Sequence, residues 1–152
     1  MLVYFDFIMN VCKLYILYLF FIFIFPLLFF LQILADHPDI AEAAVVGVRD
    51  KLRGQVPLGL FVVNDRSTKT EVQIVEEIVS MVRTRLGPVA FFKTAVQVKG
   101  LPKTRSGKIL RATIRSIANG DDYKVPATVE SLDVVKDIEA IIRQHEVLDV
   151  EA

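Results

Sequence analysis

The chain has 152 residues, with 18 Lys or Arg balanced by 18 Asp or Glu, which is long enough for one domain with a substantial core. A net charge of zero provides no overall field that would attract nucleic acid or an acidic membrane surface. The single Cys12 excludes an internal disulfide and a cysteine-based zinc site, and His37 and His145 do not have metal-ligand spacing.

The first part of the chain differs in composition from the rest. No charged residue occurs from Leu14 to Ala35, and only Pro26 and Gln32 interrupt this apolar run. A helix of about 20 apolar residues spans the hydrocarbon core of a bilayer, so residues 14–35 are a candidate transmembrane helix. A cleaved signal peptide fits less well, because its apolar region is usually only about 7 to 15 residues long.

The same composition allows a second explanation. Phe, Leu, Ile and Tyr dominate the segment, with few of the small residues that pack helices together in membranes, and T-rich DNA encodes such residues. The stretch FPLLFFLQ, residues 25–32, can be written as a pyrimidine tract that ends in CAG, the pattern that precedes an exon. We therefore treat residues 1–32 as a separate hydrophobic segment, either a transmembrane helix or translated intron sequence.

The residues after position 35 predict an α+β domain. Residues 42–50 and 56–64 are short valine-rich runs, which predict two buried strands joined by the turn LRGQ. Gly59, inside the second run, indicates a close approach of another segment to the strand backbone. Residues 91–102 predict a third strand, so we expect a small three-stranded sheet backed by helices.

Residues 67–88 carry the clearest helix signals in the chain. Thr68 and Glu71 match a capping box at the start, and Gly87 with Pro88 would end the helix. The apolar face is expected to consist of residues at spacings of three and four, namely Val72, Val75, Val79, Val82 and Leu86.

Two further helices are expected towards the C-terminus. Residues 108–119 predict a helix that ends at Gly120, with Ile114 and Ile117 facing the core together with Leu110. Residues 131–144 predict a terminal helix. Its apolar face would contain Val134, Val135, Ile138, Ile141 and Ile142.

A run of basic residues that contains no acidic residue lies between the third strand and the second helix. Its members are Lys99, Lys103, Arg105, Lys108, Arg111 and Arg115. If the helix begins near Lys108, three of these cations share one helix face, and the amides of Ser106, Gly107 and Lys108 are free to bind phosphate. The alternative is a solvated cationic face without a ligand. Nucleic-acid binding is disfavoured, because this segment lacks aromatic residues that could stack on bases.

The string LPKTRSGKILR, residues 101–111, resembles the terminal signature of AMP-forming acyl-CoA synthetases, in the adenylate-forming superfamily. The resemblance extends to residues 37–50 (HPDIAEAAVVGVRD), 83–88 (RTRLGP) and 118–130 (ANGDDYKVPATVE), and covers about residues 31–143. These segments look like the C-terminal lid domain of the acetyl-CoA and propionyl-CoA synthetase branch. The tail is most similar to the propionyl-CoA synthetase type.

The resemblance implies roles for individual residues. In this family the lysine of the SGK motif, here Lys108, is catalytic when a carboxylate attacks the α-phosphate of ATP to give acyl-AMP and pyrophosphate. Pro102, Ser106 and Gly107 would shape the turn that presents this lysine. In the acetyl-CoA synthetase pattern an arginine near the end of the preceding helix contacts CoA phosphate in the second half-reaction, and Arg83 is similar in position. Independently of the resemblance, the run of basic residues makes Lys103, Arg105 and Arg111 candidates for binding an anion.

The family's adenylation domain, which holds ATP and the acyl group, has no counterpart in this sequence. We therefore expect a C-terminal domain, residues 33–120, with an extension over residues 121–152, from an acid–CoA ligase that uses propionate or acetate, ATP with magnesium, and CoA. We expect it to bind no cofactor, metal or nucleic acid alone and to be inactive without an adenylation domain. The alternative is a non-enzymatic module, tethered to a membrane through residues 14–35, that binds CoA or a separate adenylation subunit. Family relatives occur in mitochondria and cytosol.

Overall fold

Two valine-rich segments form the central hairpin of the structure, a computed structural model that describes residues 27–87, 92 and 94–149. β1 (Ile40–Asp50) and β2 (Gly54–Val63) pair antiparallel, and β3 (Thr94–Gln97) lies parallel to β2, in the order β1-β2-β3. The predicted three-stranded sheet is confirmed, although its third strand has only 4 residues.

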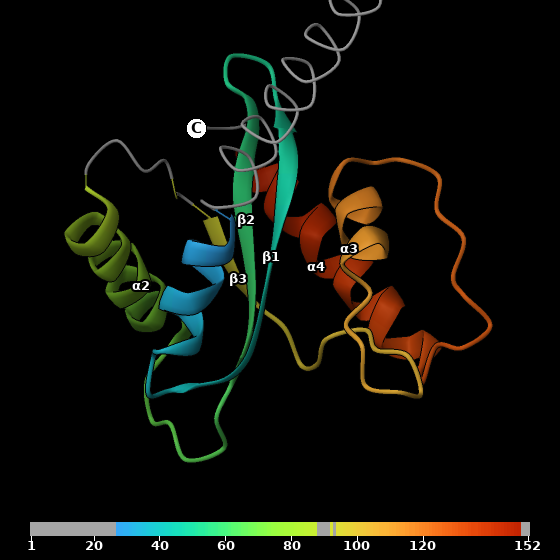
Figure 1. Ribbon diagram of the computed structural model, residues 1–152, viewed down its shortest axis with the longest axis horizontal. Helices are drawn as coiled ribbons and strands as arrows, with labels where there is room; N and C mark the ends of the chain where they lie inside the picture. The colour runs from blue at the N-terminus through green and yellow to red at the C-terminus, as the bar shows by residue number, and fades with distance from the viewer. Residues whose placement is uncertain (1–26, 88–91, 93, 150–152) are drawn as a thin grey trace, which may run out of the picture.

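Helices cover both faces of the sheet (Figure 1). One face packs against α2 (Glu71–Leu86) and a helical segment over residues 27–35, and the other packs against α3 (Arg111–Ala118) and α4 (Leu132–Asp149). Successive side chains of a strand point to opposite faces, so neighbouring residues of β2 enter different cores. Leu60 and Phe61 are accordingly both fully buried, each in a different core.

Gly59 of β2 lies against the core that contains α2 and the helical segment over residues 27–35. A Cβ atom at this position would come within 2.9 Å of Phe92 Cζ and 3.1 Å of Leu34 Cδ2. These distances leave no room for a side chain. The close approach that was expected at Gly59 is therefore confirmed.

The capping residues predicted for α2 were wrong, while its end at Gly87 is confirmed. Thr70, not Thr68, is the N-cap, and it forms a capping box with Gln73. Gly87 ends the helix with a φ of 84°, which a residue without a Cβ adopts at little cost. Thr68 lies outside the helix, because the chain enters the helical conformation only at Glu71.

The predicted apolar face of α2 was also partly wrong. The fully buried residues are Ile74, Ile78 and Val82, whereas Val72 is 66% exposed. The buried residues recur every four positions and the expected ones at spacings of three and four, so the sequence contains two overlapping apolar stripes. Ile74 and Ile78 were missed, Val82 was expected correctly, and the expected Val75, Val79 and Leu86 pack at the edge of the same core.

The helix predicted over residues 108–119 begins later than expected. α3 starts at Arg111, its N-cap is Leu110, and no side chain caps it. Asn119 is the C-cap, and Gly120 follows with a positive φ of 66°. The expected burial of Ile114 and Ile117 is confirmed, but Lys108 lies before the helix rather than within it.

The terminal helix is confirmed and is longer than predicted, since α4 extends to Asp149. Val135, Ile138 and Ile142 are buried in the core that it shares with α3. Val134 and Ile141 pack at the edge of that core, as the pattern indicated.

Residues 1–26 lie outside the described residues, so the candidate transmembrane helix is described only at its C-terminal end. There, residues 27–35 form a helix that packs on the sheet, with Phe30, Ile33 and Leu34 buried. The ring of Phe30 stacks on Phe92, with 5.2 Å between centroids. The core thus includes residues on both sides of the predicted domain boundary at residue 33. Among the described residues, no helix combines the length and apolar character needed to cross a membrane.

Candidate functional site

The candidate lysine lies in a small hairpin that precedes α3. Lys103 and Ile109 face each other across the hairpin, and the Thr104 N–H donates to the carbonyl oxygen of Lys108 at 2.9 Å. The Gly107 N–H donates to the carbonyl oxygen of Thr104 at 2.8 Å, which closes the turn. Gly107 has a φ of 80°, a left-handed conformation that suits glycine at the end of a three-residue hairpin loop.

Thr104 connects the two strands of this hairpin through its side chain as well. Its Oγ1 accepts a hydrogen bond from the Lys108 N–H at 3.1 Å and lies 2.9 Å from Ser106 Oγ. The base of the hairpin is closed by Pro102, which is buried and whose carbonyl oxygen accepts from the Leu110 N–H at 2.8 Å. The sequence interpretation missed Thr104, although threonine in a turn often bonds to nearby backbone.

The expected arrangement for binding phosphate at a helix start is wrong. The amides of Gly107 and Lys108 donate to Thr104 within the hairpin, and α3 begins only at Arg111. Lys108 therefore does not share a helix face with Arg111 and Arg115, which stand four residues apart on α3. The amides of Gly107 and Lys108 are therefore not available to an anion bound beside Lys108.

The basic run divides into paired and unpaired cations. Lys103 forms an ion pair with Glu42 and is only 28% exposed, and Lys99 lies 4.0 Å from Asp137. A second group has exposed side chains with no hydrogen-bond or ion-pair partner among the described residues. It consists of Arg105, Lys108, Arg111 and Arg115.

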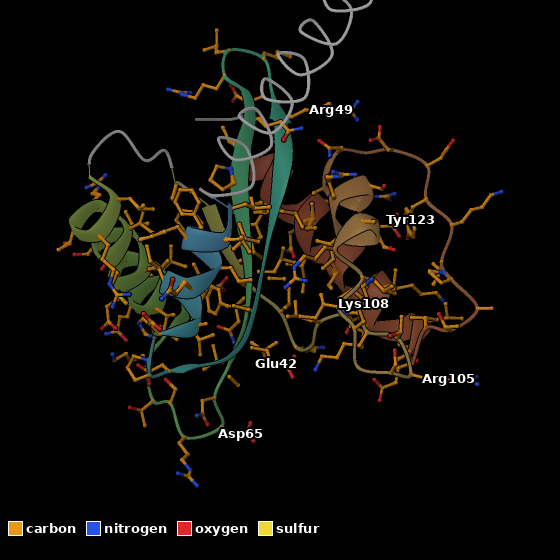
Figure 2. All side chains as sticks on the ribbon, viewed as in Figure 1. Glu42, Arg49, Asp65, Arg105, Lys108 and Tyr123 are labelled. Carbon is orange, nitrogen blue, oxygen red and sulfur yellow. The ribbon has the colours of Figure 1, made fainter. Side chains whose placement is uncertain are left out.

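Figure 2 shows Lys108 and Arg105 on the side of the sheet where α3 and α4 pack. Ile109, next to Lys108, packs against the core of that side. Arg83 lies on α2, which covers the other face of the sheet, and lines an open groove with Val75 and Val79. The structure therefore does not bring Arg83 and Lys108 together, because the sheet lies between them.

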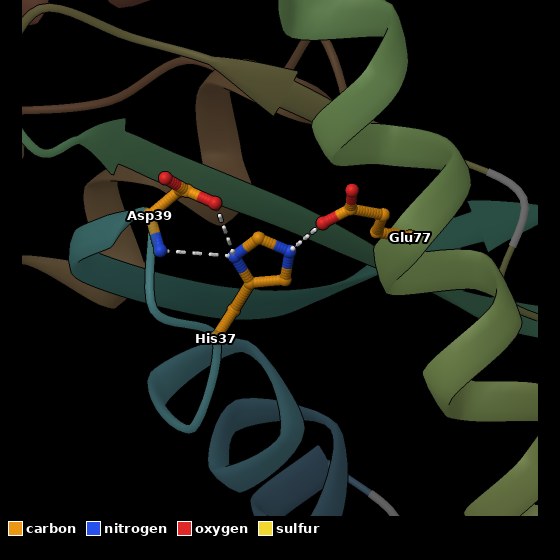
Figure 3. A group of neighbouring side chains, drawn as sticks. All are labelled: His37, Asp39 and Glu77. Carbon is orange, nitrogen blue, oxygen red and sulfur yellow. Dashed lines mark hydrogen bonds and ion pairs between the residues drawn. The ribbon is translucent and has the colours of Figure 1, made fainter. Parts of the chain in front are cut away.

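A second cluster of ionisable side chains, which the sequence interpretation missed, lies around His37 (Figure 3). His37 is 2% exposed, and its Nε2 lies 2.9 Å from Glu77 Oε2. The Asp39 N–H donates to His37 Nδ1 at 3.2 Å, so Nδ1 is an acceptor and Nε2 carries the proton that is donated to Glu77. The partners are up to 40 residues apart, and no local pattern could have indicated the cluster.

This cluster has the residue types of a metal site but not the arrangement. His37, Asp39 and Glu77 lie within 4.8 Å of one another. However, the two carboxylates approach opposite nitrogens of the ring (Figure 3), and the ammonium of Lys69 lies 2.9 Å from Asp39 and 2.7 Å from Glu77. Lys69 already supplies the positive charge that the two carboxylates require, so the cluster is structural.

The charges of this cluster shift one another's protonation. Hydrogen bonding to Lys69 is the main cause that lowers the pKa of Asp39 and of Glu77. In return, the hydrogen bond between Lys69 and Glu77 raises the pKa of Lys69, and the hydrogen bond to Asp39 adds a smaller effect in the same direction. Opposite charges in contact favour each other's ionised form, which explains both directions.

Comparison with known proteins agrees with this fold. The model of the family "AMP-binding enzyme C-terminal domain" matches residues 32–108, from the first described helix to the candidate lysine. The mouse protein "acyl-CoA synthetase short-chain family member 3, mitochondrial" is 48% identical over 109 residues, which cover 72% of this chain and 16% of the relative. "Acetyl-coenzyme A synthetase" of Campylobacter jejuni is 34% identical over 114 residues, or 72% of this chain and 17% of the relative.

Among solved structures, acetoacetyl-CoA synthetase from Streptomyces lividans superposes with a TM-score of 0.61. The match covers 76% of this chain and 18% of that protein, and at 18% sequence identity it supports the fold alone. The chain thus spans 16% and 17% of the length of the two curated relatives described above.

Proposed function

Because this chain belongs to the family of AMP-binding enzyme C-terminal domains, we propose that it supplies the catalytic lysine of a short-chain acyl-CoA synthetase. In this reaction a carboxylate, either propionate or acetate, attacks the α-phosphate of ATP to form acyl-AMP and release pyrophosphate. CoA then attacks the acyl group and AMP leaves. The printed names of the relatives, short-chain acyl-CoA and acetyl-CoA synthetases, support this substrate class.

The state of Lys108 is the observation that supports this function best. Its backbone is held by hydrogen bonds within the hairpin, while its side chain is exposed and has no partner among the described residues. A compact, mobile ammonium can approach the α-phosphate and the carboxylate as negative charge develops between them. Lys103, in contrast, already neutralises Glu42 and would have to break that pair to act in the same way.

The rest of the reaction requires a partner. Because the chain covers 16% and 17% of its curated relatives, we propose that an adenylation domain provides the sites for ATP and the carboxylate, and that this chain alone is inactive. Arg105 and Arg111, which are exposed and unpaired within the described part of the chain, are our candidates for additional phosphate contacts. Lys103 is a weaker candidate, since it is paired with Glu42.

Arg83 is our candidate for binding a phosphate of CoA in the second half-reaction. It is exposed on α2, with no ion-pair partner among the described residues, beside an open groove. Since Arg83 and Lys108 lie on opposite sides of the sheet, one active site cannot contact both at once. We therefore propose that the adenylation domain meets the two faces in turn, one for each half-reaction.

Isotope exchange between pyrophosphate and ATP tests the proposal. We expect no carboxylate-dependent exchange with the full chain alone, and measurable exchange when a separately produced adenylation domain of an acyl-CoA synthetase is added. Lys108→Ala should then lower the rate by about 10²- to 10³-fold, the usual effect of removing one electrostatic catalytic group. Lys124→Ala, at an exposed lysine, is the matched control and should retain the full rate. Equal activity of the Lys108→Ala and wild-type chains would refute the proposal.

A further inference from the structure

A segment of the C-terminal extension lies beside the hairpin that carries Lys108. The Arg105 N–H donates to the carbonyl oxygen of Thr128 at 2.9 Å, and the Glu130 N–H donates to the carbonyl oxygen of Lys103 at 2.9 Å. Between these two bonds, Thr104 faces Val129 in antiparallel pairing. The strand that contains Thr104 is therefore paired on both sides, with the Lys108 strand on one side and residues 128–130 on the other.

Pairing with residues 128–130 makes the Lys108 hairpin more rigid than two strands alone would be. An isolated two-stranded hairpin is marginally stable in water, and a third strand with an apolar face adds the stability that it lacks. Val129 and Ile109 both pack against the core formed by α3 and α4. The three short strands thus form a ribbon that is attached to the domain core rather than a free loop.

The C-terminal extension is held in place both before and after residues 128–130. Before it, the Tyr123 hydroxyl donates to Glu139 Oε2 of α4 at 2.9 Å. Burial and the nearby Glu139 raise the pKa of the Tyr123 hydroxyl, so it stays protonated and able to donate at neutral pH. After it, the chain enters α4 at Leu132, whose helix is buried through Val135 and Ile138. Residues 128–130 therefore have little freedom to move away from the hairpin.

Thr104 links this strand to the backbone of Lys108. Its main chain is the middle of the ribbon, and its Oγ1 accepts the hydrogen bond from the Lys108 N–H. A shift of residues 128–130 would move Thr104. Through Thr104 it would also move the backbone of Lys108, and with it the Lys108 side chain. Errors of about 1 Å in the position of a catalytic group can cost about 100-fold in rate, so this coupling matters for chemistry.

We propose that Thr128–Glu130 form a positioning strand, and Thr104 a positioning residue, for the ammonium group of Lys108. The positioning strand lies outside residues 32–108, which match the family model, so the extension completes the geometry of a site in the matched domain. This inference rests on the function proposed for Lys108 in one respect only, its effect on the rate. The mechanical coupling can be measured without any reaction.

Amide hydrogen exchange of the full chain, resolved by residue, tests the coupling. Glu130→Pro removes the N–H that donates to Lys103, so we expect the amides of Arg105 and Lys108 to exchange at least about fivefold faster. Ala127→Pro is the control, because residue 127 is the second residue of the turn closed by Val129 N–H and Pro126 O, where proline is favoured. Exchange at Ile114 in α3 should not change in either variant, which shows that the domain stays folded.

Unchanged exchange at Lys108 in Glu130→Pro would overturn the positioning strand. So would equal acceleration in Ala127→Pro, because a general loosening of the extension would then explain the result. These outcomes do not depend on activity. If the chain fails to restore activity to an adenylation domain, the proposed function fails while the exchange data still decide the coupling.

The effect on catalysis is tested by two substitutions at Thr104 in the reconstituted reaction. Thr104→Val removes the hydroxyl but keeps the branched shape, and we expect kcat for acyl-AMP formation to fall about tenfold, with KM for ATP and for the carboxylate unchanged. Thr104→Ser restores the hydroxyl and should recover most of the rate. Equal loss in both variants, or a change in KM alone, would show that Thr104 has only a structural role.

Discussion

The ammonium group of Lys69 lies between the carboxylates of Asp39 and Glu77, which also surround the buried His37. Together these side chains join the end of the first described helix, the start of β1 and α2. Because Lys69 lowers the pKa of both carboxyl groups, their ionised forms stabilise the folded state. That contribution is complete above the ordinary pKa values of 3.8 and 4.5 and is lost as pH falls through the lowered values.

Replacing Lys69 by methionine should reduce the pH dependence of stability at both ends of the range. In the wild-type chain the pKa of Lys69 is raised above 10.5, so its contribution is present below pH 10.5 and is lost as pH rises through the raised value. We expect Lys69→Met to be less stable than wild type at pH 7 and to lose less stability towards pH 2 and above pH 10.5. Urea unfolding midpoints across this range measure the effect. A wild-type excess of stability that is constant with pH would contradict it, and Lys124→Met is the control.

The residue scale also shows which parts of the site could be predicted from the sequence. The hairpin lysine and its neighbours form one continuous string, so Pro102, Ser106, Gly107 and Lys108 could be assigned to a turn together. The partners of the string could not, since the carbonyl oxygen of Thr128 and the carboxylate of Glu42 reach it through the tertiary fold. The His37 cluster has the same origin, because its members come from the turn before β1, the loop before α2, and α2 itself.

At the scale of elements, α2 shows how local signals can compete. Both Thr68 and Thr70 precede the helix, and each has a residue three positions later that can return a hydrogen bond, Glu71 or Gln73. The structure uses Thr70, whose N–H donates to Gln73 Oε1 at 2.9 Å. The two capping signals are equivalent in the local sequence, so the sequence alone does not decide between Thr68 and Thr70.

Paired substitutions at the two threonines test this assignment. Thr70→Ala should lower the free energy of unfolding by about 0.5 to 2 kcal/mol, since it leaves an N-terminal amide of α2 without its acceptor. Thr68→Ala should change it by less than about 0.5 kcal/mol, because the residue lies outside the helix on an exposed surface. Chemical denaturation of both variants gives the comparison. A larger loss for Thr68→Ala would show that the helix begins earlier.

The packing of β2 against the first helical segment depends on Gly59. In Gly59→Ala the new methyl group would lie 2.9 Å from Phe92 Cζ and 3.1 Å from Leu34 Cδ2. The ring of Phe92 or the helical segment that carries Leu34 would therefore have to move. We expect a loss of about 1 to 3 kcal/mol in unfolding free energy, typical of overpacking in a core. Denaturant titration measures it. Gly54→Ala is an unsuitable control because its φ is positive, so Gly47→Ala on the paired strand is the reference, since its new methyl group would meet only the end of the flexible Gln55 side chain. A loss of less than about 0.5 kcal/mol for Gly59→Ala would mean that the helical segment does not pack here.

At the scale of the whole molecule, the sheet separates two surfaces with different candidate roles. The sequence predicted the sheet and the helices that build these surfaces, because periodicity and turn residues are local features. It could not predict that Arg83 of α2 and the PKTRSGK segment would lie on opposite faces, since they are close together in the chain. That separation results from the path through β3, which crosses from the layer of α2 to the layer of α3.

The separation predicts that substitutions on the two faces affect different half-reactions. With an added adenylation domain, Lys108→Ala should slow pyrophosphate exchange by about 10²- to 10³-fold but leave thioester formation from supplied acyl-AMP and CoA within about threefold of wild type. Arg83→Ala should do the reverse, raising KM for CoA about tenfold, as the loss of one charged phosphate contact would, without slowing exchange. Because the two half-reactions follow one another, the double variant should carry out the complete reaction about as slowly as Lys108→Ala alone, since the slowed adenylation step then limits the rate. Loss of both half-reactions from either single substitution would mean that one face serves both steps.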